Sequence, residues 1–297
     1  MADTNWAFAQ YENIRKRLPA SSAFGAAQRI PDLAALADDF DVFLFDAYGV
    51  LNYGDTPVAG AVERVAALQA LGKRCMVLTN GASFPTRDSL AKYRRYGHDF
   101  TPADVISSRD ILAAHLAQNR SSGWAAMAPE GALPEGLGVD FELLKDDPAS
   151  YARARGFLLI GSQIWNDDRQ ALLVNALREA PRPVLVGNPD LVARYEHRFN
   201  LQPGLYAHWL AEETGIEPEF FGKPFAGIFA EAKLRFGAVP PGRVLMIGDT
   251  LHTDILGGAA AGFKTLLIED HGMFKGADLR PYIEKSGISP DFIAPTI

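Results

Sequence analysis

The chain has 297 residues, of which 48% are hydrophobic and 22% charged, so we expect a globular protein of about two domains rather than a disordered or fibrous one. The net charge of −7 and the lack of a basic cluster argue against a nucleic-acid partner. No apolar stretch is long enough to cross a membrane, the N-terminus lacks signal-peptide features, and Cys75 is the single cysteine, which together predict a cytoplasmic protein with no membrane partner.

The first 39 residues are predicted to form a helical extension whose apolar side chains serve packing rather than chemistry. An apolar strand then runs through Phe45 into Asp46, and the chain turns at Gly49. In open α/β sheets, ligands and catalytic groups gather outside the carboxyl ends of the strands, so Asp46 is a candidate nucleophile. Taken alone, Asp46 could equally be a strand-end cap.

Helical and strand patterns alternate from Asp46 to about residue 119, and this alternation predicts a parallel sheet flanked by helices. The second strand ends in Thr79, Asn80 and Gly81. A hydroxyl group and exposed backbone amides in such a turn can hold phosphate oxygens. The alternative is an ordinary turn, in which Asn and Gly are common.

A polar stretch at 119–123 is predicted to lead into a second domain that is inserted into the first. We expect this cap domain at 120–205 and the core domain at 1–119 plus 206–297. A helix near 205–213 is expected to lie in the core, after the chain has returned from the cap.

Two segments near the C-terminus carry charged candidates. Lys223 lies in a Gly-Lys-Pro turn before an amphipathic helix, where it is either a point charge for a phosphoryl group or an ordinary surface lysine. Another apolar strand ends at Asp249, and Asp254 follows five residues later. Together with Asp46, these carboxylates would suit Mg²⁺, which prefers oxygen ligands, and capping of the next helix is a compatible alternative.

Four short motifs occur in an order that resembles the haloacid dehalogenase (HAD) superfamily over nearly the whole chain. The long segment between the second and third motifs, and the Gly-Lys-Pro form of the third, resemble the subfamily IIA branch with nucleotide monophosphatase and pyridoxal phosphatase relatives. The resemblance implies an α/β fold, with a Rossmann-like parallel-sheet core and an inserted α/β C2-type cap. Some relatives dimerise through the cap, so it also allows a homodimer. The motifs are Asp46-Ala47-Tyr48-Gly49, Thr79-Asn80-Gly81, Gly222-Lys223-Pro224 and Gly248-Asp249-x4-Asp254.

The resemblance further implies a Mg²⁺-dependent hydrolase that acts on a small phosphorylated metabolite through an aspartyl-phosphate intermediate. Asp46 would be the nucleophile, Lys223 would steady the transferring group, and the backbone carbonyl of Tyr48 would join the metal ligands. The implied metal ligands are Asp46, Tyr48, Asp249 and Asp254, and the implied substrate contacts are Thr79, Asn80, Gly81, Asn188 and Asp190.

Tyr48 departs from the phosphatase pattern, because phosphatases of the superfamily usually carry a second Asp at this position as general acid and base. Tyrosine still offers a backbone carbonyl but no carboxylic proton, so we expect slow or selective turnover that favours leaving groups in no need of a proton. Dehalogenases of the superfamily carry Tyr at this position but lack the Asp249 and Asp254 pair in this form. The alternatives are therefore a metal-free dehalogenase with Asp46 as nucleophile, and a non-catalytic protein that binds a phosphorylated ligand.

Overall fold

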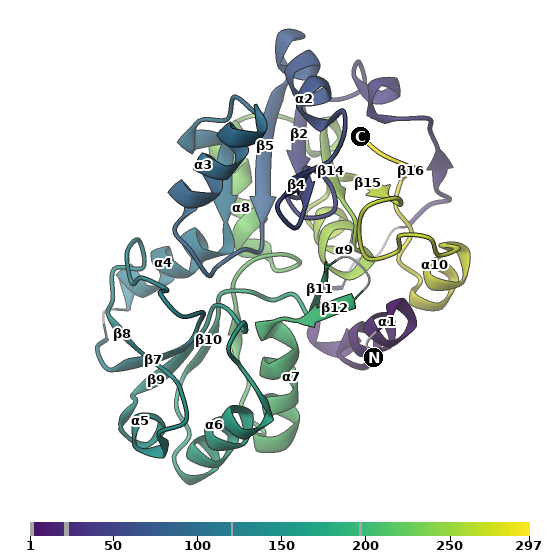
Figure 1. The fold of residues 1–297 in the computed structure, drawn as a ribbon. Coiled ribbons are helices and arrows are strands. Elements are labelled where there is room, and N and C mark those ends of the chain that lie inside the picture. Colours follow the sequence, from purple (N-terminus) through teal and green to yellow (C-terminus); the bar gives the residue numbers. More distant parts are fainter. Residues whose placement is uncertain (1–2, 21–23, 120, 196–197) are drawn as a thin grey trace.

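The computed structural model describes residues 3–20, 24–119, 121–195 and 198–297 (Figure 1). Residue 120, within the predicted domain boundary, and residues 1–2 and 21–23 of the predicted extension lie outside the described residues. In the described residues, no helix is both long and apolar enough to span a membrane.

The core is a parallel sheet of seven strands in the described residues, in the order β1-β16-β15-β14-β2-β5-β6. Helices lie on both faces of this sheet (Figure 1), which confirms the predicted α/β fold with a parallel-sheet core. The strands are β1 (Gln28–Arg29), β2 (Val42–Phe45), β5 (Arg74–Thr79), β6 (Val105–Ser107), β14 (Val244–Gly248), β15 (Lys264–Ile268) and β16 (Phe292–Ala294).

Strand β2 is buried on both faces, as its unbroken apolar sequence requires. Successive side chains of a strand point to opposite faces, so Phe43 and Phe45 join the apolar cluster under one layer of helices and Val42 and Leu44 join the cluster under the other. The core helices are α2 (Ala61–Ala70), α3 (Thr86–Tyr96), α4 (Ser108–Gln118), α8 (Ala226–Phe236), α9 (Leu256–Ala260) and α10 (Arg280–Ser286), with a π-helical turn at Leu251–Ile255 before α9.

A second, separate parallel sheet lies below the core in Figure 1 and has the strand order β13-β10-β9-β7-β8, as expected for a cap domain. Three helices pack with this sheet in one apolar cluster: α5 (Pro148–Arg153), α6 (Asp167–Glu179) and α7 (Pro203–Thr214). The strands are β7 (Trp124–Met127), β8 (Phe141–Leu143), β9 (Gly156–Leu159), β10 (Val184–Val186) and β13 (Glu219–Phe220).

Helix α7 was expected in the core, but its buried residues Tyr206, Ala207 and Leu210 pack with the apolar residues of the second sheet. Strand β13 also pairs with β10 of this sheet. The cap range of 120–205 stays a prediction, and these contacts favour a later return to the core, near Phe221.

Two antiparallel hairpins and the N-terminal segment complete the molecule. The hairpins are β3 (Asn52–Tyr53) with β4 (Thr56–Pro57), and β11 (Val192–Tyr195) with β12 (Arg198–Leu201). Helix α1 (Thr4–Asn13) packs between the β11–β12 hairpin and the core (Figure 1). The predicted helical extension is only partly helical, because β1 adds to the open edge of the core sheet beside β16.

Candidate active site

Asp46, Thr79 and Asp249 meet at one edge of the core sheet, because β2 lies between β14 and β5 and each residue stands at the carboxyl end of its strand. The backbone N–H of Asp46 donates to the Ile247 carbonyl of β14 at 2.8 Å, so the pairing of the two strands continues as far as Asp46. The predicted position of these residues at the strand ends is confirmed.

The ammonium group of Lys223 is buried between two of the carboxylates. Its Nζ lies 2.6 Å from Asp46 Oδ1 and 2.7 Å from Asp254 Oδ1, and the side chain is 2% exposed. Burial alone would lower the pKa of Lys223, but the Asp254 and Asp46 carboxylates outweigh it and raise the pKa above its ordinary value. Lys223 is therefore a charged, internal lysine, and the surface-lysine alternative is wrong.

Asp46, Asp249 and Asp254 each place a carboxylate oxygen within 4.8 Å of the others. The backbone N–H groups of Asp249 and Thr250 both donate to Asp254 Oδ2 at 3.2 Å, and the Met273 N–H donates to Asp249 Oδ2 at 2.7 Å. These hydrogen bonds hold the carboxylates in place. An arrangement of carboxylate oxygens suits a hard divalent cation better than a soft one.

Gly49 lets the backbone approach Asp249 closely. It has φ +80°, and a Cβ atom at this position would lie 2.8 Å from the Asp249 carboxylate. Any other residue would therefore combine backbone strain with a clash against the carboxylate cluster. A side chain at Gly272 would meet the same carboxylate.

The carboxylate cluster carries more negative charge than Lys223 offsets. Burial raises the pKa of Asp46 well above its ordinary range; Lys223 opposes this rise, and Asp254 and Asp249 add to it. Burial, followed by the Asp254 charge, raises the pKa of Asp249 to about 7. A bound divalent cation would relieve this repulsion, so the residues present fit the metal that the motifs imply.

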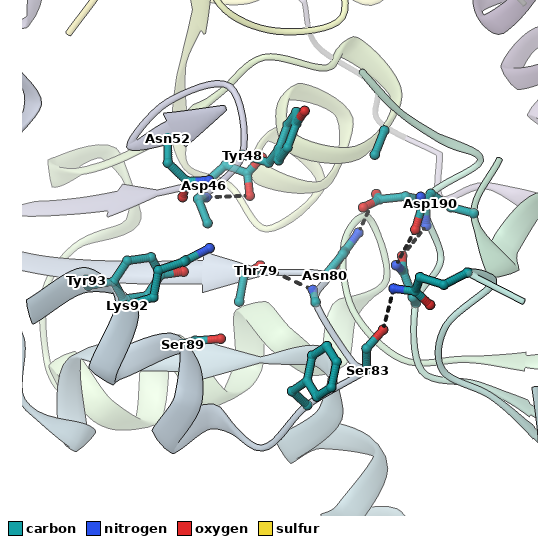
Figure 2. A pocket seen from close by; sticks show the side chains of 17 residues that line it. Asp46, Tyr48, Asn52, Thr79, Asn80, Ser83, Ser89, Lys92, Tyr93 and Asp190 are labelled. Carbon is teal, nitrogen blue, oxygen red and sulfur yellow. Dashed lines mark hydrogen bonds between the residues drawn. The ribbon is translucent and has the colours of Figure 1, made fainter. Parts of the chain in front are cut away.

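A pocket of about 290 Å³ lies between the core and the second sheet, and Figure 2 shows it from close by. The Gly81 N–H donates to Thr79 Oγ1 at 3.2 Å. The Asp190 N–H donates to Asn188 Oδ1 at 3.0 Å, so these two residues also form an Asx turn. The pocket is lined by all of the predicted substrate contacts, Thr79, Asn80, Gly81, Asn188 and Asp190, whose roles stay predictions.

Tyr48 also lines this pocket. Figure 2 shows its ring turned away from Asp46, with the hydroxyl group at the far end. Asp190 reaches the pocket from the loop after β10, and its Oδ1 accepts a hydrogen bond from Asn80 Nδ2 at 2.8 Å. Burial is the main cause that raises the pKa of Asp190 to about 6.

Sequence reasoning missed one wall of the pocket, which is formed by Ser89, Lys92 and Tyr93 of α3. These residues stand three and four positions apart, which is the spacing of side chains on one face of a helix. The spacing was visible in the sequence, but nothing there indicated that this face of α3 turns toward Asp46.

From its position two residues before Asp254, His252 could approach the site or lie exposed on the surface, but the structure shows neither. Its side chain is fully buried beneath α1, where Nε2 lies 2.6 Å from Glu12 Oε1 and the ring stacks on Tyr11 at 5.0 Å. A residue two positions from Asp254 thus faces away from the pocket, because the turn of the helix points it toward the N-terminal segment.

Comparisons with known proteins agree with this geometry. A family model described as haloacid dehalogenase-like hydrolase matches residues 43–142, and a HAD-hydrolase-like model matches residues 220–297. The glycerol-3-phosphate phosphatase of Homo sapiens is 30% identical over 293 residues, with 89% of this chain and 90% of the relative covered. The chain belongs to the haloacid dehalogenase-like hydrolases.

This hydrolase is also similar to phosphoglycolate phosphatase 1A of Arabidopsis thaliana, with 27% identity over 265 residues, 82% of this chain and 72% of the relative. Among solved structures, one from Cytophaga hutchinsonii titled a possible sugar phosphatase of the HAD superfamily has a TM-score of 0.79 at 25% identity. The match covers 91% of this chain and 98% of the solved structure's chain. The predicted superfamily is confirmed.

Proposed function

We propose that this hydrolase is a Mg²⁺-dependent phosphatase that cleaves small phosphorylated metabolites through an aspartyl-phosphate on Asp46. The observation that carries this proposal is the position of Lys223 Nζ, 2.6 Å from Asp46 and 2.7 Å from Asp254, at the edge of a carboxylate cluster. A buried cation beside a carboxylate nucleophile is what transfer of a dianionic phosphoryl group requires. The phosphatase activities after which both relatives are named support the same reaction.

Asp46, Asp249 and Asp254 would hold the Mg²⁺, together with the backbone carbonyl of Tyr48. When bound, the ion supplies positive charge that stabilises the phosphoryl oxygens. The close approach that Gly49 allows, and the raised pKa values of Asp46 and Asp249, support a cation at this place.

The protein residues would carry out the two chemical steps. An Asp46 carboxylate oxygen forms a bond to phosphorus while the bond from phosphorus to the ester oxygen breaks, and the leaving oxygen takes up a proton. Water then attacks the phosphorus of phospho-Asp46, gives up a proton, and releases inorganic phosphate and the free carboxylate. Lys223, the Thr79 hydroxyl group and the Gly81 N–H would hold the phosphoryl oxygens in both steps.

We assign the proton to Asp190, in place of the carboxylate that position 48 lacks. Asp190 lines the pocket with Asp46, whereas the Tyr48 ring turns away in Figure 2 and His252 is buried elsewhere. A pKa of about 6 suits a group that gives and takes a proton near neutral pH. Turnover is still expected to favour aryl and acyl phosphates, whose leaving groups need little protonation.

The test is a set of initial rates on aryl, acyl, sugar and nucleotide phosphates, with Mg²⁺ or chelator, for the wild type, Asp46→Asn and the exposed-site control Asp99→Asn. We expect Mg²⁺-dependent release of phosphate that only Asp46→Asn abolishes, and acid-stable labelling of Asp46 during turnover. Halide release that survives the chelator would instead establish the dehalogenase. Tight binding of phosphate esters without any turnover would establish the binding protein.

Three further properties are proposed with this activity: a small-molecule substrate without a nucleic-acid or membrane partner, a cytoplasmic location, and a homodimer. The net charge of −7 supports the first. Sedimentation of the purified protein tests the dimer, and fractionation of the source cells tests the location.

A further inference from the structure

Helix α3 brings a second cation to the pocket besides Lys223. Ser89, Lys92 and Tyr93 line the same wall, and Figure 2 shows the Lys92 amine pointing into the pocket on the side of Asp46 and Thr79. The polar side chains on this face of α3 thus line the same pocket as Asp46. A substrate bound at Asp46 would extend into this pocket.

The two lysines differ in how their charge is balanced. Lys223 is shared by two carboxylates, at 2.6 Å and 2.7 Å. Lys92 forms no ion pair with any carboxylate in the described part of the chain, and its Nζ lies 5.3 Å from the centre of the Tyr93 ring. Burial lowers the pKa of Lys92, while Asp55 and Asp46 act at longer range in the opposite direction. In the described part of the chain the Lys92 amine therefore has no carboxylate partner that would compete with a ligand.

We propose that Lys92, assisted by Ser89, binds a second anionic group of the substrate, so that this hydrolase prefers phosphate esters of small hydroxy acids to those of neutral polyols. The inference rests on the proposed phosphatase function. It distinguishes the substrates after which the two relatives are named, since phosphoglycolate carries a carboxylate and glycerol 3-phosphate carries hydroxyl groups.

The positions of the two lysines support different roles for them. The phosphoryl group would lie against Asp46 and Lys223, where the buried charges are already arranged for it. Lys92 is partly exposed and comes from a different wall, so it meets the part of the substrate beyond the phosphorus. A pocket of about 290 Å³ holds a small molecule in which only a few bonds separate the two anionic groups.

The test compares kcat/KM on 2-phosphoglycolate, glycerol 3-phosphate and p-nitrophenyl phosphate. Lys92→Met should lower the value for phosphoglycolate about 10- to 100-fold, the range for a lost hydrogen bond to a charged group, and leave the other two within about 3-fold. Lys92→Arg should keep most of the preference. The matched control is Arg94→Met, which removes the same charge from an exposed position of α3 outside the pocket.

An equal loss on all three substrates would place Lys92 at the phosphoryl group and overturn the proposal, as would an unchanged preference. If the wild type hydrolyses none of them, the proposed function fails, and the inference is then decided by binding. Calorimetry with Asp46→Asn and Mg²⁺ should give weaker phosphoglycolate binding when Lys92→Met is added. Equal affinity in the two proteins would overturn it.

Discussion

The Asn80 side chain and the Lys223 backbone bond each other in both directions. The Lys223 N–H donates to Asn80 Oδ1 at 2.7 Å, and Asn80 Nδ2 donates to the Lys223 carbonyl at 2.8 Å. The same Nδ2 donates to Asp190 Oδ1 at 2.8 Å. One buried amide therefore joins the end of β5, the lysine turn and the loop that follows β10, three segments far apart in the sequence.

Replacing this amide should loosen the lysine turn. We expect Asn80→Ala to lower kcat about 10- to 100-fold, because Lys223 loses its fixed position, and to lower the free energy of unfolding by about 1–3 kcal/mol for the buried groups left unsatisfied. Steady-state rates on p-nitrophenyl phosphate and urea unfolding measure the two effects. Asn119→Ala, at the exposed end of α4, is the control. An unchanged kcat would show that Asn80 does not position Lys223.

Lys223→Met should leave Asp46 and Asp254 buried without their counter-charge. Turnover is expected to fall at least about 100-fold, as for the loss of one group that stabilises a transition state, and the metal-free protein should lose about 3–5 kcal/mol of stability. Added Mg²⁺ should restore part of that stability, which a melting curve records. Lys264→Met, which breaks an exposed pair with Asp291, should cost no more than about 1 kcal/mol. Similar losses in both variants would contradict the assignment.

Two glycines with φ +80° provide a matched pair, because a Cβ atom at Gly49 would meet Asp249 at 2.8 Å and one at Gly60 would meet nothing within 4 Å. Both alanine variants carry the same backbone strain of about 1–2 kcal/mol. Gly49→Ala alone should also disturb the carboxylate cluster and weaken Mg²⁺ binding. A Mg²⁺ titration followed by calorimetry distinguishes them, and equal affinities would mean that Gly49 does not shape the metal site.

The Asp190 carboxyl should make stability depend on pH with a defined sign. Its folded pKa of about 6 lies above the ordinary value of 3.8, so between these values the folded protein binds more protons than the unfolded chain. Its contribution to the free energy of unfolding therefore falls as pH rises from about 4 to about 6, and stays level above that.

Urea unfolding at pH 4.5, 6 and 7.5 tests this sign. The decrease should be smaller in Asp190→Asn than in the wild type, and Asp99→Asn should follow the wild type. A steeper decrease in Asp190→Asn would contradict the raised pKa.

The positions of the candidate catalytic carboxylates could be predicted from local sequence patterns. Apolar runs that stop at Asp46 and Asp249 predict strand ends, and parallel strands bring their carboxyl ends to one edge wherever they lie side by side. The Gly-Lys-Pro turn and the Thr79 turn each had an ordinary structural alternative. Their functional roles were predicted only because both belong to the ordered set of motifs. The family comparisons confirm the superfamily that the ordered set predicts, while the roles of the individual residues stay predictions.

Other features were decided by contacts between distant segments. Lys92 and His252 are both basic residues in helical patterns, yet Lys92 faces the pocket and His252 is buried beneath α1. Helix α7 has an apolar face that would suit either sheet, and its packing against the second sheet moves the favoured domain boundary toward Phe221.

By itself, the sequence determined that two apolar runs form strands β2 and β14 and that each ends in a carboxylate, because these features depend on neighbours along the chain. Only the tertiary structure decided which face of α3 lines the pocket, that His252 is enclosed beneath α1, and that Asn80 holds Lys223 and Asp190 together. The physical reason is that periodicity defines the faces of an element, whereas the partner of each face is chosen by packing across the whole molecule.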